Sequence, residues 1–151
     1  MTSRFTIAVH ALGMLACEGA RCPGKGLTSE EIARSANTNP VVVRRVFADL
    51  RRAGLVETRR GAGGGVVLAR QASQITLRSV WEALEEQEQL FTGHPAGPNP
   101  RCPVGLALAG YLHDLYGQAQ EQLKRSLGNV TLAKLQRDID GRVAHSSTRT
   151  G

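Results

Sequence analysis

The most constraining stretch of this sequence is residues 27–54, where two complete helix-start signals follow one another. Thr28 and Glu31 have the spacing of a capping box, in which each side chain binds the backbone N–H of the other residue. Asn39 is a favoured N-cap residue, and Pro40 follows at the first helical position, where its missing N–H costs nothing. Because only a short polar turn separates the two signals, the stretch predicts two short helices joined as in a helix-turn-helix.

The second of these helices is expected to be amphipathic. Its apolar residues recur at spacings of three and four, which predicts one buried face, and its basic residues lie off that face. Gly54 follows the helix and is the glycine expected at its end. Two helices are predicted before this amphipathic helix, at residues 3–16 and 29–36. The apolar residues are Val43, Val46, Phe47 and Leu50, and the basic residues are Arg44, Arg45, Arg51 and Arg52.

A glycine-rich hairpin is expected directly after the second helix. Two short β-strands are predicted at 55–59 and 66–70, and the sequence RGAGGG between them (60–65) forms the tip. A helix-turn-helix followed by such a hairpin is a winged helix-turn-helix, which we assign to residues 1–72. The predicted fold class is therefore mainly α, with a small β-hairpin as the wing and a long C-terminal helix.

Each part of this unit has a task on double-stranded DNA. The second helix lies in the major groove, where Asn and Arg can pair with adenine and guanine and Val can contact a thymine methyl group. The wing glycines let the backbone approach the duplex, and the arginines beside them reach phosphate or a narrow minor groove. The predicted DNA-binding residues are Thr28, Thr38, Asn39, Val41, Val42, Arg44, Arg45, Arg52, Arg59, Arg60, Gly61 and Gly63.

The C-terminal half is predicted to hold a linker helix, a loop and a long helix. The segment 92–103 is rich in proline and glycine, and apolar residues then recur with helical spacing over 104–127. A helix of this length is longer than one small domain needs for its own packing. We therefore expect it to pack against the same helix of a second copy in a homodimer. Packing within the monomer is the alternative. We assign the linker helix, the sensor loop and the dimerisation helices to residues 73–139, and the last of these helices is short and begins at residue 132. The polar tail 140–151 is expected to be disordered.

The composition favours a DNA-binding regulator over an enzyme or a membrane protein. The net charge is +6 and the pI is near 9.9, which suits a polyanionic partner. No apolar run approaches the roughly 20 residues that span a membrane, so we expect a cytoplasmic location. No P-loop, dinucleotide fingerprint or HExxH motif is present, so we predict no enzymatic activity. Two alternatives are a merely solvated basic face and a winged helix that contacts only proteins.

Several segments of the sequence resemble the Rrf family of bacterial transcription regulators. The resemblance spans roughly residues 3–135 and implies a homodimer with crossed long helices, which most often acts as a repressor. The chain differs from the family at one position of the wing. The family usually carries an aromatic residue directly after the paired glycines, whereas this chain has Val66 there. The segments that carry the resemblance are Leu27–Ala33, Pro40–Leu50, Ala53–Val56, Arg60–Gly65, Leu68–Arg70, Ile75–Leu77 with Val80, and Cys102–Gly105.

The loop before the long helix departs from the family's pattern in its cysteines. Cluster-binding members carry three closely spaced cysteines there, whereas this chain has Cys102 alone. A conventional iron–sulfur cluster held by three local thiolates therefore does not fit. We assign no cofactor and no metal ion, and a metal or unusual cluster helped by His94, His113 or the other cysteines stays an alternative.

Cys102 is the predicted redox sensor. It lies beside Arg101 and just before a helix N-terminus, and nearby positive charge and the helix dipole both favour the reactive thiolate. Oxidation to a sulfenic acid or a disulfide could shift the loop, move the long helices and change the spacing of the DNA half-sites. The alternatives are an unreactive buried thiol and a regulator that binds a small molecule between the wing domain and the long helix.

Overall fold

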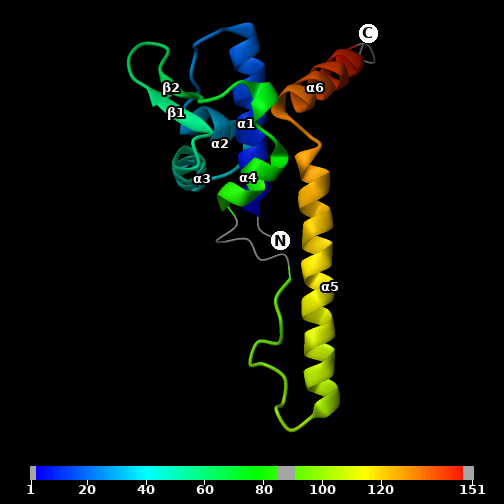
Figure 1. Ribbon diagram of the computed structural model, residues 1–151. Coiled ribbons are helices and arrows are strands. Elements are labelled where there is room, and N and C mark those ends of the chain that lie inside the picture. Colours follow the sequence, from blue (N-terminus) through cyan, green and yellow to red (C-terminus); the bar gives the residue numbers. More distant parts are fainter. Residues whose placement is uncertain (1–2, 85–90, 148–151) are drawn as a thin grey trace.

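A computed structural model describes residues 3–84 and 91–147 of the chain (Figure 1). The predicted fold class is confirmed, because the described residues are mainly helical and carry one two-stranded antiparallel hairpin. Helices α1 to α4 and the hairpin form one body, from which α5 extends far to one side (Figure 1). The elements are α1 (Ser3–Arg21), α2 (Ser29–Ala36), α3 (Pro40–Arg52), β1 (Val56–Arg59), β2 (Gly65–Leu68), the 3₁₀ helix η1 (Ala72–Gln74), α4 (Leu77–Leu84), α5 (Pro103–Gly128) and α6 (Leu132–Ser147).

The two helix starts that dominate the sequence are formed as predicted. The Thr28 hydroxyl accepts a hydrogen bond from the Glu31 backbone N–H at 3.2 Å, and the Glu31 carboxylate accepts one from the Thr28 backbone N–H at 2.8 Å. Asn39 caps α3 by accepting from the Val41 N–H at 2.8 Å. Asn37 ends α2 in the left-handed conformation, with φ 48°, so the chain reverses within a very short turn.

The hydrophobic core gathers around α1. Ala8, Ala11 and Leu12 of this helix are fully buried, and α2, α3, α4 and α6 all pack against it. Trp81, which is the single tryptophan of the chain, lies on α4 with its ring edge against Phe5 at a centroid distance of 5.3 Å. It is buried, and its indole N–H has no hydrogen-bond partner among the described residues. Trp81 thus packs at the junction of α4 and α1.

A third segment of backbone ties the wing to the body. β1 and β2 pair with Arg59 opposite Gly65, and Leu27 then forms a bridge with Val66 through backbone hydrogen bonds of 2.8 and 3.0 Å. Gly65 has φ +134°, and a Cβ atom there would lie 2.7 Å from the Leu27 carbonyl oxygen. Glycine is required at this position both for its backbone conformation and for this close approach.

The C-terminal helix is longer than the sequence suggested. We expected a short helix at 132–139 and disorder over 140–151, but α6 continues to Ser147, so residues 140–147 are helical, and residues 148–151 lie outside the described part of the chain. Its first turns are held against α1, where Leu135 and Ile139 lie beside Gly13. Side-chain contacts then support the later turns, because Asp140 lies 3.6 Å from Arg21 and Ser146 donates to the Arg142 carbonyl.

Helix α5 leaves most of its surface uncovered. None of the residues that the structure describes in it is buried. Among the described helices, none combines the length and the hydropathy needed to cross a bilayer.

Candidate DNA-binding surface

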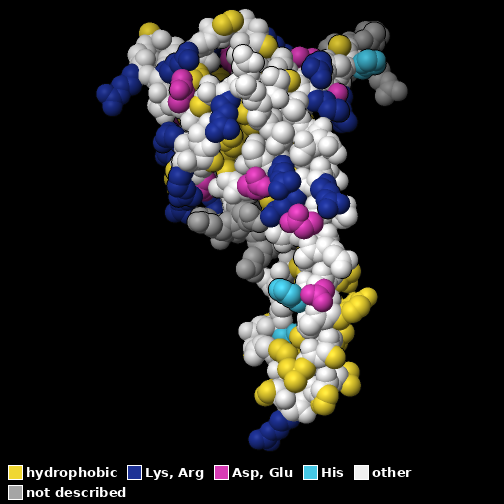
Figure 2. All heavy atoms as spheres, in the orientation of Figure 1, with side chains coloured by type: hydrophobic (Ala, Val, Ile, Leu, Met, Phe, Trp, Pro, Cys, Tyr) yellow, Lys and Arg dark blue, Asp and Glu magenta, His cyan; other side chains and the backbone are white. Residues whose placement is uncertain are grey.

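The outer face of α3 carries a row of exposed side chains. Val41, Arg45, Ala48 and Arg52 recur at spacings of three and four residues, and all four are exposed. The opposite face of the helix enters the core through Val46 and its neighbours. Figure 2 shows Lys and Arg side chains gathered along the edge of the molecule that α3 and the wing form. The helix thus presents a basic surface whose middle, at Ala48, is small enough for another surface to come close.

Three of the predicted DNA-binding arginines are engaged with carboxylates in the free protein. Arg44 pairs with Glu30 of α2. Arg52 pairs with Asp49 at 2.7 Å, and Arg59 lies 3.3 Å from Glu57. Because all three guanidinium groups are exposed, a phosphate can compete for each of them with little desolvation cost.

Two other predicted arginines, Arg45 and Arg60, have no ion pair among the residues that the structure describes. Both are exposed, Arg45 on the outer face of α3 and Arg60 just after β1 at the start of the hairpin tip. These two side chains are therefore the ones whose full charge is available to an incoming polyanion.

The remaining predicted contacts differ in how open they are. The side chains of Thr28 and Asn39 are exposed, but their oxygen atoms already cap α2 and α3. Thr38 is half-buried, as is Val42, which packs against the core and is less accessible than Val41. Of the two valines, Val41 has the more open side chain for contact with a base.

The glycines of the wing tip fall into two groups. Gly61 and Gly63 have positive φ, and a Cβ atom at either position would meet no atom within 4 Å. Gly64 is different, because a Cβ atom there would lie 2.5 Å from the Arg59 carbonyl oxygen. The predicted Gly61 and Gly63 thus lie on the open outer side of the wing, whereas Gly64 is needed for its turn.

Sequence reasoning missed two carboxylates that act on this surface. The backbone N–H of Glu30 itself and the Arg44 guanidinium hold the pKa of the Glu30 carboxyl below its usual value, so this group stays ionised beside the recognition face. Asp49 points inward from α3 and forms ion pairs with Arg52 and with Arg4 of α1. An acidic residue among arginines is the signal in the sequence that could have suggested such pairs, although spacing does not reveal the contact between residues 4 and 49.

Cys102 has a structural role that the sequence did not suggest. It is the N-cap residue of α5, and its Sγ accepts a hydrogen bond from the Gly105 N–H at 3.3 Å. The thiol is half-buried and free. Of the other two cysteines, Cys22 is exposed, whereas burial, and after it the charge of Asp140, raises the pKa of the Cys17 thiol.

The donor groups around Cys102 do not suit an iron–sulfur cluster or a metal ion. Within residues 3–84 and 91–147, no three His, Cys, Asp or Glu side chains come together in a way that could hold a metal. The only thiol near the start of α5 is Cys102, and it already serves as the helix cap. We therefore derive no role for such a group in this chain.

A helix-turn-helix, a hairpin fixed to its base and a basic outer face together define a winged-helix, DNA-binding transcriptional regulator. Residues 1–138 match the Rrf2 family, described as "Iron-dependent Transcriptional regulator". The chain belongs to the Rrf2 family, as its resemblance to the Rrf regulators suggested. It is 34% identical over 132 residues to the "Putative HTH-type transcriptional regulator YwnA" of Bacillus subtilis (strain 168), covering 87% of this chain and 93% of that protein.

Solved structures of related regulators share the fold. The IscR of T. potens has a TM-score of 0.68 at 21% identity, over 92% of this chain and 87% of that one. CymR, the global cysteine regulator of B. subtilis, has a TM-score of 0.64 at 23% identity, over 91% of this chain and 95% of that one. At these identities the likeness establishes the winged-helix architecture, and the relatives are regulators of transcription and not enzymes.

Proposed function

We propose that the protein is a homodimeric transcriptional repressor that reads its operator with α3 and the wing. The observation that carries this proposal is the exposed row on α3, where the unpaired Arg45 lies between Val41 and Ala48. An arginine at such a position can form a bidentate contact with guanine, and a valine can contact a thymine methyl group. Arg60 and the open glycines of the wing tip are placed to contact the backbone of the same duplex.

The dimer is supported by an exposed apolar stripe on α5. Val104, Leu108, Tyr111 and Leu115 recur at helical spacing, and each is at least 45% exposed. Figure 2 shows hydrophobic side chains concentrated on the free end of this helix. A contiguous apolar face of this kind on a monomer marks an interaction surface, and a twofold contact with a second copy would cover it.

A dimer also explains how a small domain can bind tightly and specifically. Two recognition helices held by crossed α5 helices would meet half-sites about one helical turn apart. A dimer bound across a promoter would block access of RNA polymerase, which is the mode of repression proposed here.

The proposal is tested by fluorescence anisotropy on the DNA upstream of the protein's own gene and on a randomised site library. Wild-type protein should bind with an affinity that falls steeply as salt rises, because phosphate contacts release counterions. Arg45→Ala should flatten the preference among sequences, whereas Arg52→Ala should weaken binding to all sequences alike. Unchanged relative affinities in Arg45→Ala would remove its base-reading role. Absence of salt-sensitive binding would favour a module that binds proteins.

We further propose that Cys102 makes this repressor responsive to oxidation. The sulfur caps the first turn of α5, so its oxidation by a peroxide to a sulfenic acid, with reduction of the peroxide to an alcohol or water, replaces the group that accepts the Gly105 N–H. The change would act at the start of the helix that carries the proposed dimer stripe.

Two variants separate this thiol chemistry from helix capping. Cys102→Ser keeps a good cap and removes the thiol, and Cys102→Ala removes both. DNA binding by the reduced wild type should weaken after mild peroxide treatment, and binding by Cys102→Ser should not change. Cys22→Ser should respond like the wild type. If the wild type, Cys102→Ser and Cys22→Ser respond equally, or if none of them responds, Cys102 is not the sensor, and the DNA-binding proposal is unaffected.

A further inference from the structure

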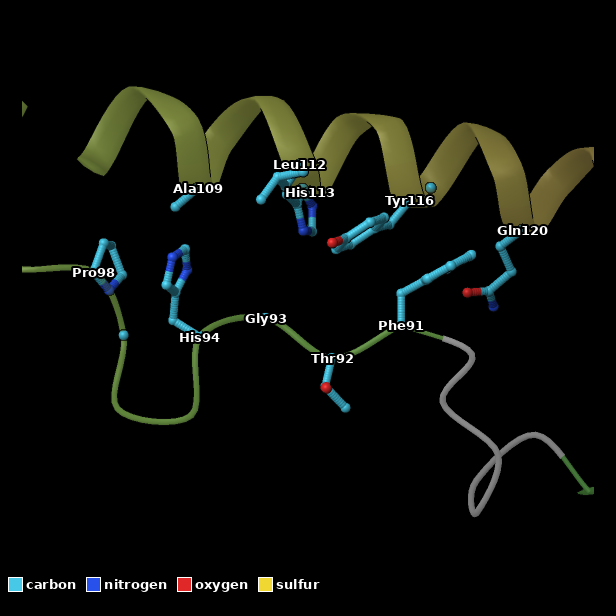
Figure 3. Close-up of a pocket in the computed structure, with 12 residues that line it drawn as sticks. Phe91, Thr92, Gly93, His94, Pro98, Ala109, Leu112, His113, Tyr116 and Gln120 are labelled. Atoms are coloured by element: carbon cyan, nitrogen blue, oxygen red, sulfur yellow. The ribbon is translucent and has the colours of Figure 1, made fainter. Parts of the chain in front are cut away.

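A cavity lies between α5 and the loop that precedes it (Figure 3), well away from α3 and the wing (Figure 1). Its volume is about 780 Å³, which is within the range of roughly 300–1,000 Å³ typical of small-molecule sites. One wall is the loop at 91–98, and the other is the face of α5 that includes Ala109, Leu112 and Tyr116. The cavity is open on one side, so a small molecule can enter it without unfolding either wall.

Aromatic rings and a glycine shape the interior. Phe91 stacks on Tyr116 with a centroid distance of 4.7 Å and an interplanar angle of 10°. His94 projects toward α5 from the other side of Gly93 (Figure 3). Because Gly93 has no side chain, the space between His94 and the stacked pair is open, and Gly117 on α5 likewise leaves its position empty. The opening is lined by flat rings, which favours a planar aromatic occupant.

The polar groups of the cavity are uncharged or weakly basic. None of the described residues that line it is a Lys, Arg, Asp or Glu. Two imidazoles enter it, His94 from the loop and His113 from α5, and neither ring is hydrogen-bonded within the described part of the chain. An imidazole both donates and accepts hydrogen bonds, which matches a hydroxyl group better than a carboxylate, because no fixed cation lies there to balance a full negative charge.

The cavity and the apolar stripe of α5 occupy different faces of the helix. The cavity face runs through Ala109, Leu112 and Tyr116, whereas the stripe runs through Leu108, Tyr111 and Leu115. The two series are offset by one residue, which corresponds to about 100° around the helix. A second copy seated on the stripe would therefore leave the cavity open.

We propose that this cavity is a binding site for a small phenolic compound, with the ring between His94 and the Phe91–Tyr116 pair and the hydroxyl on the imidazoles. The inference goes beyond the proposed function, because it gives the regulator a chemical ligand. It can be tested without DNA, so its failure and the failure of DNA binding are separate results.

The experiment is a titration of the full-length, reduced protein followed by calorimetry and ligand-observed NMR. The probes are 4-methylphenol, 4-methylanisole, 4-methylcyclohexanol and 4-methylbenzoate, which test in turn the phenol, the loss of its O–H, the loss of the aromatic ring and the addition of a charge. We expect saturable binding of 4-methylphenol and at least tenfold weaker binding of the other three. His94→Phe and His113→Phe should abolish the preference for the phenol over the anisole.

Gly117→Leu should fill the cavity and weaken 4-methylphenol binding at least tenfold, because Gly117 lines the cavity and a Cβ atom at this position meets no atom within 4 Å. Gly110→Leu is the matched control on the same helix and should leave binding within twofold of the wild type. The proposal is overturned by absence of saturable binding, by equal or tighter binding of the benzoate or the cyclohexanol, or by unchanged binding in Gly117→Leu. Loss of the dimer in Gly117→Leu would also overturn the proposal, because it would show that the cavity face of α5 is the subunit interface.

Discussion

Arg4 of α1 and Asp49 of α3 form an ion pair across the packing of these two helices. The two residues are 45 positions apart in sequence, and Asp49 is almost completely buried. The second carboxylate oxygen of Asp49 accepts from Arg52, so a single inward-facing carboxylate links the first helix of the fold to the helix that carries the DNA-binding surface.

We expect Asp49→Asn to destabilise the fold. The amide keeps the volume of the carboxylate but removes the negative charge with which the partly buried Arg4 pairs, which should lower the free energy of unfolding by about 1–3 kcal/mol. Urea denaturation at neutral pH measures this difference. Glu57→Gln breaks the exposed pair with Arg59 and should change stability by less than about 0.5 kcal/mol. A similarly small effect in both variants would mean that the ion pairs of Asp49 contribute no more to the free energy of unfolding than an exposed pair does.

Glu30→Gln should strengthen DNA binding several-fold at low salt. The variant removes a negative charge beside the recognition face and releases Arg44 from its ion pair, so more positive charge faces the phosphates. Anisotropy titrations over a series of salt concentrations measure the effect, which should shrink as salt rises. Glu82→Gln breaks a comparable exposed pair with Arg78 on α4 and should leave affinity unchanged. Weaker binding by Glu30→Gln would show instead that Glu30 is needed to orient Arg44.

Leu108→Lys should convert a dimer into a monomer. The substitution places a charge in the middle of the apolar stripe of α5, and the residue is already half exposed within the chain, so the fold should survive. Size-exclusion chromatography with light scattering measures the mass, and circular dichroism checks the helix content. Leu106→Lys is the matched control, because Leu106 is similarly exposed but lies about 200° away around the helix. Equal masses for Leu108→Lys and the wild type would refute the dimer contact through this stripe.

Stability should fall in acid partly through Glu31. The backbone N–H and hydroxyl of Thr28 lower the pKa of the Glu31 carboxyl in the folded protein. The resulting stabilisation is complete above the unfolded-state pKa of about 4.3, and it is lost as the pH falls through the lower, folded-state value. Glu31→Gln keeps a hydrogen-bond acceptor in the capping box but does not titrate, so its thermal midpoint should drop less than that of the wild type between pH 6 and pH 3. If the thermal midpoints of the two proteins fall in parallel with pH, Glu31 is not a source of the loss of stability in acid.

The elements that local chemistry specifies were predictable from the sequence. Thr28 with Glu31 and Asn39 with Pro40 define helix starts through contacts within a few residues, and the structure places both starts as predicted. The long helix α5 was predictable in the same way, because its apolar residues recur with helical spacing. It spans Pro103–Gly128, and the sequence predicted 104–127.

Features that depend on contacts between distant segments could not be predicted. The helical residues 140–147 are polar and suggest disorder, yet α6 is aligned by its packing on α1, which no local pattern shows. The apolar residues over 104–127, from which we expected packing against a second copy, include Leu112, but this side chain lines the cavity under the loop, because the loop's path over α5 is a tertiary property. The pairing of the predicted DNA-binding Arg44 with Glu30 of α2, 14 residues away in sequence, was hidden for the same reason.

The position of Trp81 gives the protein an intrinsic optical probe. As the single tryptophan of the chain, it is the one indole emitter, and it is buried where α4 meets α1, against Phe5. Helix α4 also packs against α5, so a rearrangement of the long helix that admits water to this junction should shift the emission to longer wavelength. The dimer dissociation, thiol oxidation and ligand binding proposed above would thus be observable in the unlabelled protein, on a spectrometer and in real time.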